Sequence, residues 1–273
     1  MMWCHSWRKL FKQFCNVRMI SLMINTQFEQ HGFFHVKGFY TERELVHERE
    51  VINCFHQQWI ADNQQFYQTK AVNSAYLTAN TYLDEAQRLV LFKFIASHKL
   101  MAQVDSILES AAFMNTQLFF NPVNPEQENY WHRDMQYHLS LAEQQAALSG
   151  PEVIHCRVAL EDEPGIELVP GTHRRWDTPD ELATRLAIDH NNTSDDLATG
   201  HVIEMQAGDL LIFSANMIHR GLYGKDRLAL DILFGEPQPH VLHFVQDICL
   251  PTPAMLSTLE DASAFAVTLA HQE

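Results

Sequence analysis

Two side chains that could hold a metal ion stand two residues apart in the segment His132-Arg133-Asp134. On a β-strand, residues i and i+2 point to the same face, so His132 and Asp134 would project together and Arg133 would project to the opposite face. An imidazole and a carboxylate placed in this way can bind one metal ion. Alone, a His-x-Asp pair is a weak indication, because chance and structural roles produce it more often than metal binding does.

A third metal ligand must come from elsewhere in the chain, and His219 is a candidate. Residues 208–213 read as a turn followed by a buried strand, which leads to His219. A jelly roll can bring such distant segments side by side. Two histidines and one carboxylate on one face of a metal, with other positions open, are the arrangement of non-haem Fe(II) oxygenases. Taken alone, His219 would more often be a polar residue satisfied by ordinary hydrogen bonds.

The segment that opens at Arg227 alternates cleanly between apolar and other residues up to Phe234. The apolar residues share one face, whereas Arg227, Ala229 and Asp231 share the other. If the apolar face packs beneath helices, Arg227 points into the barrel, where a buried guanidinium requires an anionic partner. Its fork suits a carboxylate. That carboxylate belongs either to a ligand or to the protein itself, for instance to Asp231.

The elements that must position these residues change in kind along the chain. Residues 41–112 read as helical, because Thr41 and Glu44 match a capping box, Asp84 with Gln87 marks a second start, and apolar residues recur at helical spacing. After residue 113, short apolar runs alternate with turn signals. The expected strands are 116–120, 131–139, 153–160, 165–169, 201–205, 209–214, 217–223 and 227–234.

Helices first and strands later predict an α+β fold with a mainly β core, either a sandwich or a jelly roll, whose helices pack on one sheet. We expect a single domain over residues 1–273. Its parts would be a basic N-terminal extension, a mainly helical region, the jelly-roll core with one polar insert, and a C-terminal extension; these are residues 1–25, 26–112, 113–236, 174–200 and 237–273. An insert of that length is either disordered or functional, for example as a lid.

The composition limits the partners of this 273-residue chain. The 34 acidic residues outnumber the 19 basic ones and give a formal net charge of −15, which disfavours nucleic acid and anionic membranes as partners. The five cysteines are widely spaced without a Cys-x-x-Cys pair, which favours a reducing compartment and hence the cytoplasm. No apolar run approaches the ~18–20 residues of a membrane-spanning helix. The chain contains 16 histidines, of which His132 and His219 are the candidate metal ligands.

The N-terminus is unusual because residues 1–28 contain four basic residues and no acidic residue. We interpret this stretch as a basic extension or as an over-extended start, with Met19 or Met23 as the initiator. A transit peptide is the alternative.

Together, these motifs resemble the phytanoyl-CoA dioxygenase family of Fe(II)- and 2-oxoglutarate-dependent oxygenases over roughly residues 26–236. Residues 28–39 look like the opening strand of the family, and residues 117–125 followed by 131–134 look like its first metal motif. Residues 168–173, Leu-Val-Pro-Gly-Thr-His, are similar to its Pro-Gly-Ser-His turn. Residues 208–219 with Arg227 look like its closing strands. Four motifs in this order are far more specific than the His-x-Asp pair alone.

The resemblance implies a double-stranded β-helix of cupin-like type. It implies that His132, Asp134 and His219 hold Fe(II), that Arg227 binds the distal carboxylate of 2-oxoglutarate, and that O₂ is the second cosubstrate. Gln117 falls where the family places a further cosubstrate contact. The reaction implied is hydroxylation of a small molecule that the sequence does not identify.

Further details bear on this site. Related halogenases carry a small residue in place of the aspartate, so Asp134 favours hydroxylation. The interval from His219 to Arg227 is shorter than in phytanoyl-CoA hydroxylases, and Gly221 stands where some members use a hydroxyl; both concern how the cosubstrate is anchored. Arg157 is a further candidate for the site.

Several other residues admit two interpretations. His138 and His155 would either line the barrel or pack within it, whereas His173 is interpreted as structural. Arg174, Arg175 and Trp176 would form either a solvated basic cluster or a substrate contact.

Two other classes of function remain open. One is a metal-dependent hydrolase or isomerase that uses the same three ligands with Zn²⁺, and the closeness of Arg227 to His219 argues against it. The other is a non-catalytic metal-binding module on the same scaffold. The sequence leaves the oligomeric state open.

Overall fold

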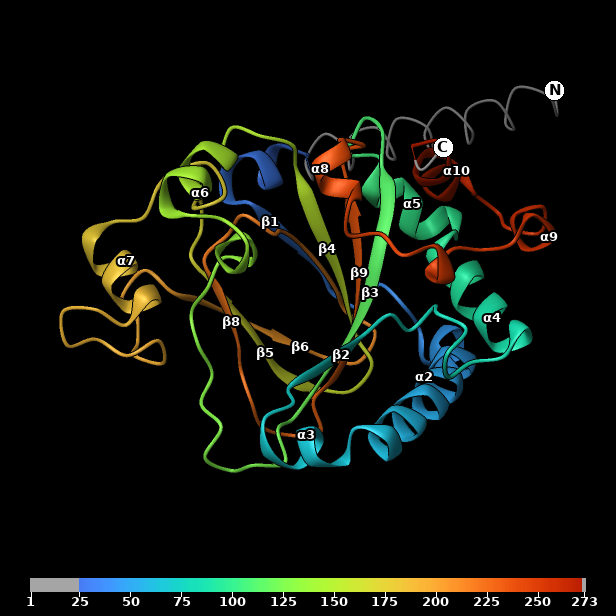
Figure 1. Cartoon of the computed structure of the whole chain (residues 1–273), viewed down its shortest axis with the longest axis horizontal. Helices are drawn as coiled ribbons and strands as arrows, with labels where there is room; N and C mark the ends of the chain where they lie inside the picture. The colour runs from blue at the N-terminus through green and yellow to red at the C-terminus, as the bar shows by residue number, and fades with distance from the viewer. Residues whose placement is uncertain (1–24, 272–273) are drawn as a thin grey trace, which may run out of the picture.

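The computed structural model describes residues 25–271, and within them the strands form two antiparallel sheets (Figure 1). The larger sheet has the strand order β1-β7-β4-β9-β3-β2, and the smaller sheet has the order β6-β5-β8. The strands are β1 (Phe33–Val36), β2 (Asn73–Ala75), β3 (Ala112–Phe120), β4 (Val153–Ala159), β5 (Glu163–Leu168), β6 (His201–Met205), β7 (Leu210–Ser214), β8 (His219–Gly221) and β9 (Leu228–Gly235). This architecture is the predicted double-stranded β-helix, in an α+β fold with a mainly β core.

Helices cover the outer face of the larger sheet, as Figure 1 shows. Those that share its core include α2 (Glu42–Asp62), α4 (Glu85–Ile95), α5 (His98–Val104) and α10 (Ser263–Ala270). Other helices of the described residues are α3 (Gln64–Thr69), α6 (Leu141–Ala147), α7 (Pro179–Leu186), α8 (Pro239–Leu242) and α9 (Pro253–Leu256). Two of them begin at the predicted capping boxes. The Glu44 carboxylate accepts the Thr41 amide N–H, and Asp84 and Gln87 exchange reciprocal hydrogen bonds.

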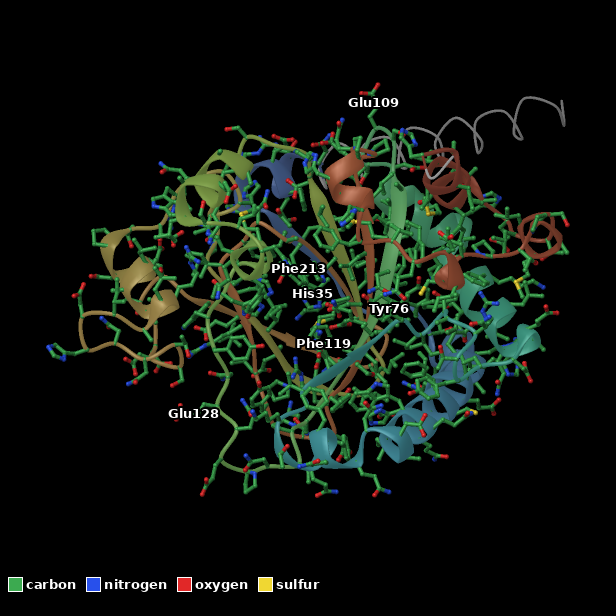
Figure 2. All side chains as sticks on the ribbon, viewed as in Figure 1. His35, Tyr76, Glu109, Phe119, Glu128 and Phe213 are labelled. Atoms are coloured by element: carbon green, nitrogen blue, oxygen red, sulfur yellow. The ribbon has the colours of Figure 1, made fainter. Side chains whose placement is uncertain are left out.

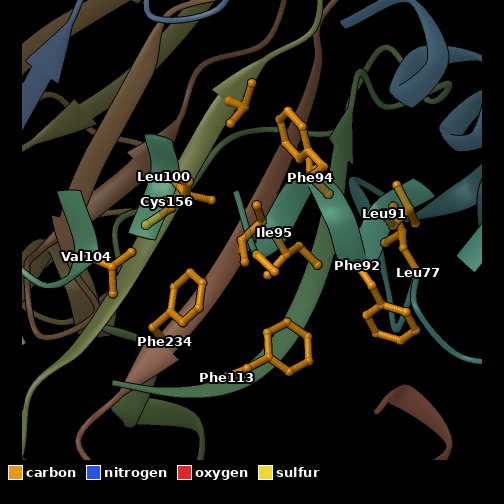
Figure 3. Close-up of a cluster of buried hydrophobic side chains, with 14 of the residues drawn as sticks. Leu77, Leu91, Phe92, Phe94, Ile95, Leu100, Val104, Phe113, Cys156 and Phe234 are labelled. Carbon is orange, nitrogen blue, oxygen red and sulfur yellow. The ribbon is translucent and has the colours of Figure 1, made fainter. Parts of the chain in front are cut away.

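The main hydrophobic core lies between these helices and the larger sheet. Leu230, Ile232 and Phe234 of β9 are buried in it, which confirms the alternation predicted for that strand. Figure 3 shows Phe234 and Phe113 facing side chains of α4 and α5. The C-terminal segment joins the same core, because Phe265 of α10 packs against the ring of Phe113 at 4.7 Å.

The two sheets also pack against each other through a smaller apolar cluster. Phe33, Leu211 and Phe213 of the larger sheet contact residues of β5 and β6, such as Ile166 and Ile203. This contact fixes the spacing of the two sheets.

The segment 131–139 differs from its prediction as a strand. His132 forms an isolated bridge with His219, and a 3₁₀ helix, η1 (Asp134–Tyr137), follows at once. The prediction was wrong because a short apolar run does not reveal the tertiary contacts that hold Arg133. The helical reading of 41–112 also missed β2, whose three residues are too few to show a period.

The polar insert at 174–200 is ordered around α7. Thr178 caps this helix by accepting the Glu181 amide N–H, and Pro179 occupies its first turn. The basic extension expected at residues 1–25, with Met19 or Met23 as initiator, falls outside the described residues except for residue 25. Within residues 25–271, no helix combines the length and the apolar character needed to cross a membrane.

Candidate metal and cosubstrate site

The structure brings His132, Asp134 and His219 together. One ligand atom from each lies within 4.8 Å of the others, which makes the group a candidate metal site. The Nε2 atoms of His132 and His219 lie 3.5 Å and 3.6 Å from the same oxygen of Asp134, Oδ1. The convergence of three ligand atoms on one point is the arrangement expected for a bound cation.

Backbone hydrogen bonds join the two histidines directly. The amide N–H of His132 donates to the carbonyl of His219 at 3.0 Å, and the amide of His219 donates back at 2.9 Å. The Nδ1 atom of each ring lies 3.1 Å from a backbone carbonyl, that of Tyr130 for His132 and that of Met217 for His219. A proton on each Nδ1 leaves both Nε2 atoms free as ligands.

Arg133 fixes the peptide between the first two candidate ligands. Its side chain is fully buried and points away from the cavity, as predicted. It donates to the Thr172 carbonyl at 2.6 Å, to the Asn216 carbonyl, and to Asp177 at 2.6 Å and 3.0 Å. Because Asn216 stands three residues before His219, Arg133 ties the turn that carries His219 to the segment that carries the other two ligands.

The second oxygen of Asp134 is held by a buried histidine. Asp134 Oδ2 lies 2.7 Å from His155 Nε2, and His155 Nδ1 lies 3.2 Å from Asp231. Burial alone would lower the pKa of His155, but the carboxylates of Asp134 and Asp231 outweigh it and raise that pKa to about 9. Burial alone would raise the pKa of Asp134, but His155 and the neighbouring imidazoles hold it well below its usual value.

The pKa of His219 is shifted in the opposite direction to that of His155. Burial and the neighbouring His132 ring lower its pKa to about 3. The imidazole is therefore neutral at physiological pH, which is the state that binds a metal.

The polar chain continues from Asp231 to Arg227. Arg157 donates to Asp231 at 2.9 Å and to both oxygens of Glu163 at 2.9 Å and 3.0 Å. Glu163 in turn accepts from Arg227 Nε at 3.2 Å. Arg227 therefore points into the barrel, as predicted, but its carboxylate partner is Glu163. Asp231 is held by Arg157 and His155 instead.

Arg227 retains a buried donor. Its Nη1 has no hydrogen-bond partner among the described residues. The guanidinium lies between the rings of Phe119 and Tyr223, with its carbon 5.6 Å and 5.4 Å from their centres. Burial and the nearby Arg157 lower its pKa to about 10, so it remains charged at neutral pH. A buried cation with a free donor is suited to an anionic ligand.

Gly221 makes room for this guanidinium. A Cβ atom at position 221 would lie 2.5 Å from Arg227 Nη2, so a larger residue would displace the arginine. A glycine at this position, where some family members carry a hydroxyl-bearing residue, therefore leaves the space that the Arg227 guanidinium occupies.

These groups line one cavity of about 680 Å³ between the two sheets. The three candidate ligands, Arg227, Gln117 and Arg157 all border it. Gln117 lies on β3 directly opposite Asp231 of β9. In Figure 2, Phe119 and Phe213 lie in the interior of the molecule, whereas Glu109 and Glu128 project from its surface.

The other candidate residues divide between the cavity and its surroundings. His138 and His155 line the cavity, whereas His173 packs outside it, against Phe28. Burial lowers the pKa of His173 to about 4, and its ring nitrogens have no hydrogen-bond partner among the described residues. The basic cluster lies outside the cavity lining, where Arg174 pairs with Glu29, Arg175 pairs with Glu181, and Trp176 lies against Arg133.

The sequence reasoning missed the role of Glu163. Glu163 precedes Pro164-Gly165, a typical turn signal, and lies outside the strand expected at 165–169, but it is fully buried at the start of β5. No local pattern marks it, because an acidic residue before Pro-Gly is typical of exposed turns.

Comparison with known proteins extends these observations. A sequence model described as phytanoyl-CoA dioxygenase (PhyH) matches residues 28–223. No curated protein matches the sequence significantly. AviO1 from Streptomyces viridochromogenes Tue57 has a similar structure, with a TM-score of 0.53 at 15% identity over 79% of this chain and 95% of that chain. At such identity the likeness shows the fold.

Two further solved structures are similar to the same degree. HygX from Streptomyces hygroscopicus, with nickel and 2-oxoglutarate bound, has a TM-score of 0.56 at 15% identity over 76% of this chain and 84% of that chain. The non-haem α-ketoglutarate-dependent carbocyclase SnoK from nogalamycin biosynthesis has a TM-score of 0.53 at 12% identity over 79% and 83%. Because the family model spans well over half of the sequence, the chain belongs to the phytanoyl-CoA dioxygenase family.

Proposed function

We propose that the protein is an Fe(II)- and 2-oxoglutarate-dependent dioxygenase that hydroxylates a small molecule. One observation carries the proposal: a single cavity is lined both by a His/Asp/His group and by a buried guanidinium with a free donor. A hydrolytic zinc site would need the first feature and not the second. A non-catalytic metal site would need neither the free donor nor an open cavity.

The residues present fit the implied metal. His132 and His219 offer their imidazole Nε2 atoms, and Asp134 offers Oδ1 while His155 holds Oδ2. Two imidazoles and one carboxylate are the protein ligands of non-haem Fe(II) oxygenases. When bound there, iron and 2-oxoglutarate would supply the activation of O₂.

The other residues would orient the cosubstrate and exclude water. Arg227 would bind the distal carboxylate of 2-oxoglutarate through its free Nη1, and Gln117 would provide a second polar contact. The rings of Phe119 and Tyr223 cover the guanidinium. A low local dielectric strengthens such an ion pair.

Hydroxylation is favoured over halogenation because Asp134 occupies the place where a halide would have to bind. The carbocyclase SnoK indicates that this fold also supports ring formation. Product analysis distinguishes the two outcomes, since hydroxylation adds one oxygen atom to the substrate and ring closure adds none.

The decisive experiment is an anaerobic titration. The protein should develop a visible charge-transfer band only when Fe(II) and 2-oxoglutarate are both present. A metal-replete protein that shows no such band would exclude the oxygenase.

Removal of a ligand should abolish turnover. We predict that His132→Ala and Asp134→Ala each eliminate succinate formation, because two remaining ligands do not hold the metal. His35→Ala is a matched control, because His35 also pairs with an aspartate, Asp209, but does not line the cavity. Retained turnover in either ligand variant would refute the assignment.

Loss of Arg227 should act on the cosubstrate. Arg227→Ala should raise the KM for 2-oxoglutarate by about 10- to 150-fold, because a hydrogen bond to a charged group contributes about 1.5–3 kcal/mol. Arg227→Lys should recover part of the loss, since it keeps the charge without the fork. Steady-state kinetics measures both, and an unchanged KM would remove Arg227 from the cosubstrate site.

We also propose a reducing, cytoplasmic location. Cys54, Cys156 and Cys249 are free thiols, and two of them are buried. Free cysteines are typical of proteins that stay in a reducing compartment.

A further inference from the structure

The chemistry of the cavity wall changes along the inner face of the larger sheet. At one level, Asp231 of β9 lies between Gln117 of β3 and Arg157 of β4. Two residues further along β9, Leu233 lies between Asn115 and His155. The wall is therefore charged at the Arg227 end and becomes apolar beyond the candidate metal ligands.

A β-bulge at Met114 and a glycine at position 235 shape the apolar end of the cavity, which is the end lined by Met114, Val153, Leu233 and Val241. The register between β3 and β9 shifts between Phe113 and Asn115, and the intervening Met114 lines the cavity. At Gly235, a Cβ atom would lie 2.9 Å from both Met114 Sδ and Val241 Cγ1. The absence of a side chain at Gly235 therefore lets β3 and α8 meet and close this end with apolar groups.

Most of the other side chains at this end are apolar. Val153, Leu233, Val241 and Met114 form one apolar cluster. Phe244 packs against His138 at 5.2 Å and lies at the rim, where half of its surface is exposed. The side chains that could hydrogen-bond a ligand here are Asn115, Asn216, His138 and His240.

The charged side chains of the described cavity lining lie elsewhere and have other partners. Arg157 is saturated by Glu163 and Asp231, Arg227 is reserved for the cosubstrate, and Asp134 and Asp231 belong to the metal end. The phosphates of a CoA thioester or the carboxylate of an amino acid would meet no lysine or arginine of the described cavity lining at the apolar end. Burying an unpaired charge there would be unfavourable.

We propose that the apolar end, lined by Met114, Val153, Leu233 and Val241, binds an uncharged and mainly apolar small molecule with a single hydroxyl or carbonyl group for Asn115 or His240. This assignment rests on the proposed function for its catalytic meaning. It departs from the CoA thioester that the family name describes. The volume of about 680 Å³ falls in the usual range of ligand pockets, about 300–1,000 Å³.

A neutral dye tests this assignment without metal or cosubstrate. Nile red should bind the protein with one-to-one stoichiometry and a blue-shifted emission. Met114→Lys should raise its Kd by about tenfold or more, because the lysine places a charge in the apolar end. Phe244→Lys should also weaken binding, and folding tolerates it because the side chain is half exposed. Val202→Lys, an exposed apolar-to-lysine change on β6, is the matched control and should leave the Kd within about twofold, since Val202 does not line the cavity.

Competition then compares two probes with the same alkyl length. Decan-1-ol should displace Nile red, whereas decanoyl-CoA should displace it at least tenfold more weakly, because its phosphates lack cationic partners. Failure of the dye to bind, equal binding to Met114→Lys, or stronger displacement by decanoyl-CoA would each overturn the proposal. The charge-transfer band tests the oxygenase separately, so either idea can fail while the other stands.

Discussion

At the scale of single residues, His155 determines which carboxylate oxygen of Asp134 faces the other candidate metal ligands. It occupies Oδ2 of that carboxylate and leaves only Oδ1 directed at His132 and His219. A carboxylate freed from this contact could bind a metal through both oxygens and take a position that the cosubstrate needs. His155 is therefore a positioning residue for the metal site.

A pair of variants tests this role. His155→Ala should weaken Co(II) binding by about 10–100-fold, the usual effect of losing a partner behind a ligand. His155→Gln should retain most of the affinity, because its amide can donate to Asp134 from nearly the place of Nε2. A Co(II) absorption titration measures both, and wild-type affinity in His155→Ala would show that the contact has no part in metal binding.

The residue types of the site were readable in the sequence, but their contacts were not. The strand alternation after Arg227 predicted its inward direction, because that pattern is local. Its partner Glu163 is 64 residues away in sequence, and the pairing of β4 with β9 and of β5 with β8 brings the two together. His155 was recognised as a histidine on a strand, yet nothing local indicated that it lies between Asp134 and Asp231.

At the scale of elements, the insert around α7 is held by a buried ion cluster. Asp177 is fully buried and accepts from both Arg133 and Arg185, at 2.6 Å and 2.7 Å. One carboxylate thus joins α7 to the peptide between two candidate metal ligands.

Breaking this cluster should be costly. Asp177→Ala leaves two buried guanidinium groups without their carboxylate, which should lower the free energy of unfolding by about 3–5 kcal/mol. Urea denaturation measures the change. Asp196→Ala is the control, because its exposed pair with Arg220 should contribute at most about 1 kcal/mol. Equal stabilities of the two variants would show that the insert is not anchored through Asp177.

Elements with local start signals were the most predictable. The capping boxes at Thr41 and Asp84 mark the starts of real helices, and the same pattern at Thr178-x-x-Glu181 would have revealed α7 within the insert. The segment 131–139 failed because its geometry is imposed by distant carbonyls, above all those that bind Arg133. Local periodicity cannot report such contacts.

At the scale of the whole molecule, the N-terminal helices, the β-helix and the C-terminal segment share one core. The ring of Phe265 lies 5.4 Å from Phe92 of α4 and 4.7 Å from Phe113 of β3. We therefore propose that residues 25–271 form a single folding unit.

This inference predicts one cooperative unfolding transition. Phe265→Ala should lower the free energy of unfolding by about 3–5 kcal/mol, the usual effect of emptying a buried aromatic site. Circular dichroism and tryptophan fluorescence should change together in wild type and variant, because every layer depends on the same core. Separate transitions, or a loss confined to the C-terminal segment, would indicate two units.

The reciprocal backbone bonds between His132 and His219, together with the hold of Arg133 on the Asn216 carbonyl, have a thermodynamic consequence. The candidate ligands are assembled by the fold itself, so binding of a metal orders little additional chain. The loss of conformational entropy and the change in heat capacity on metal binding should both be small. In this respect the protein is the opposite of a zinc finger, in which the metal drives folding. A chelator should therefore abolish activity without unfolding the protein.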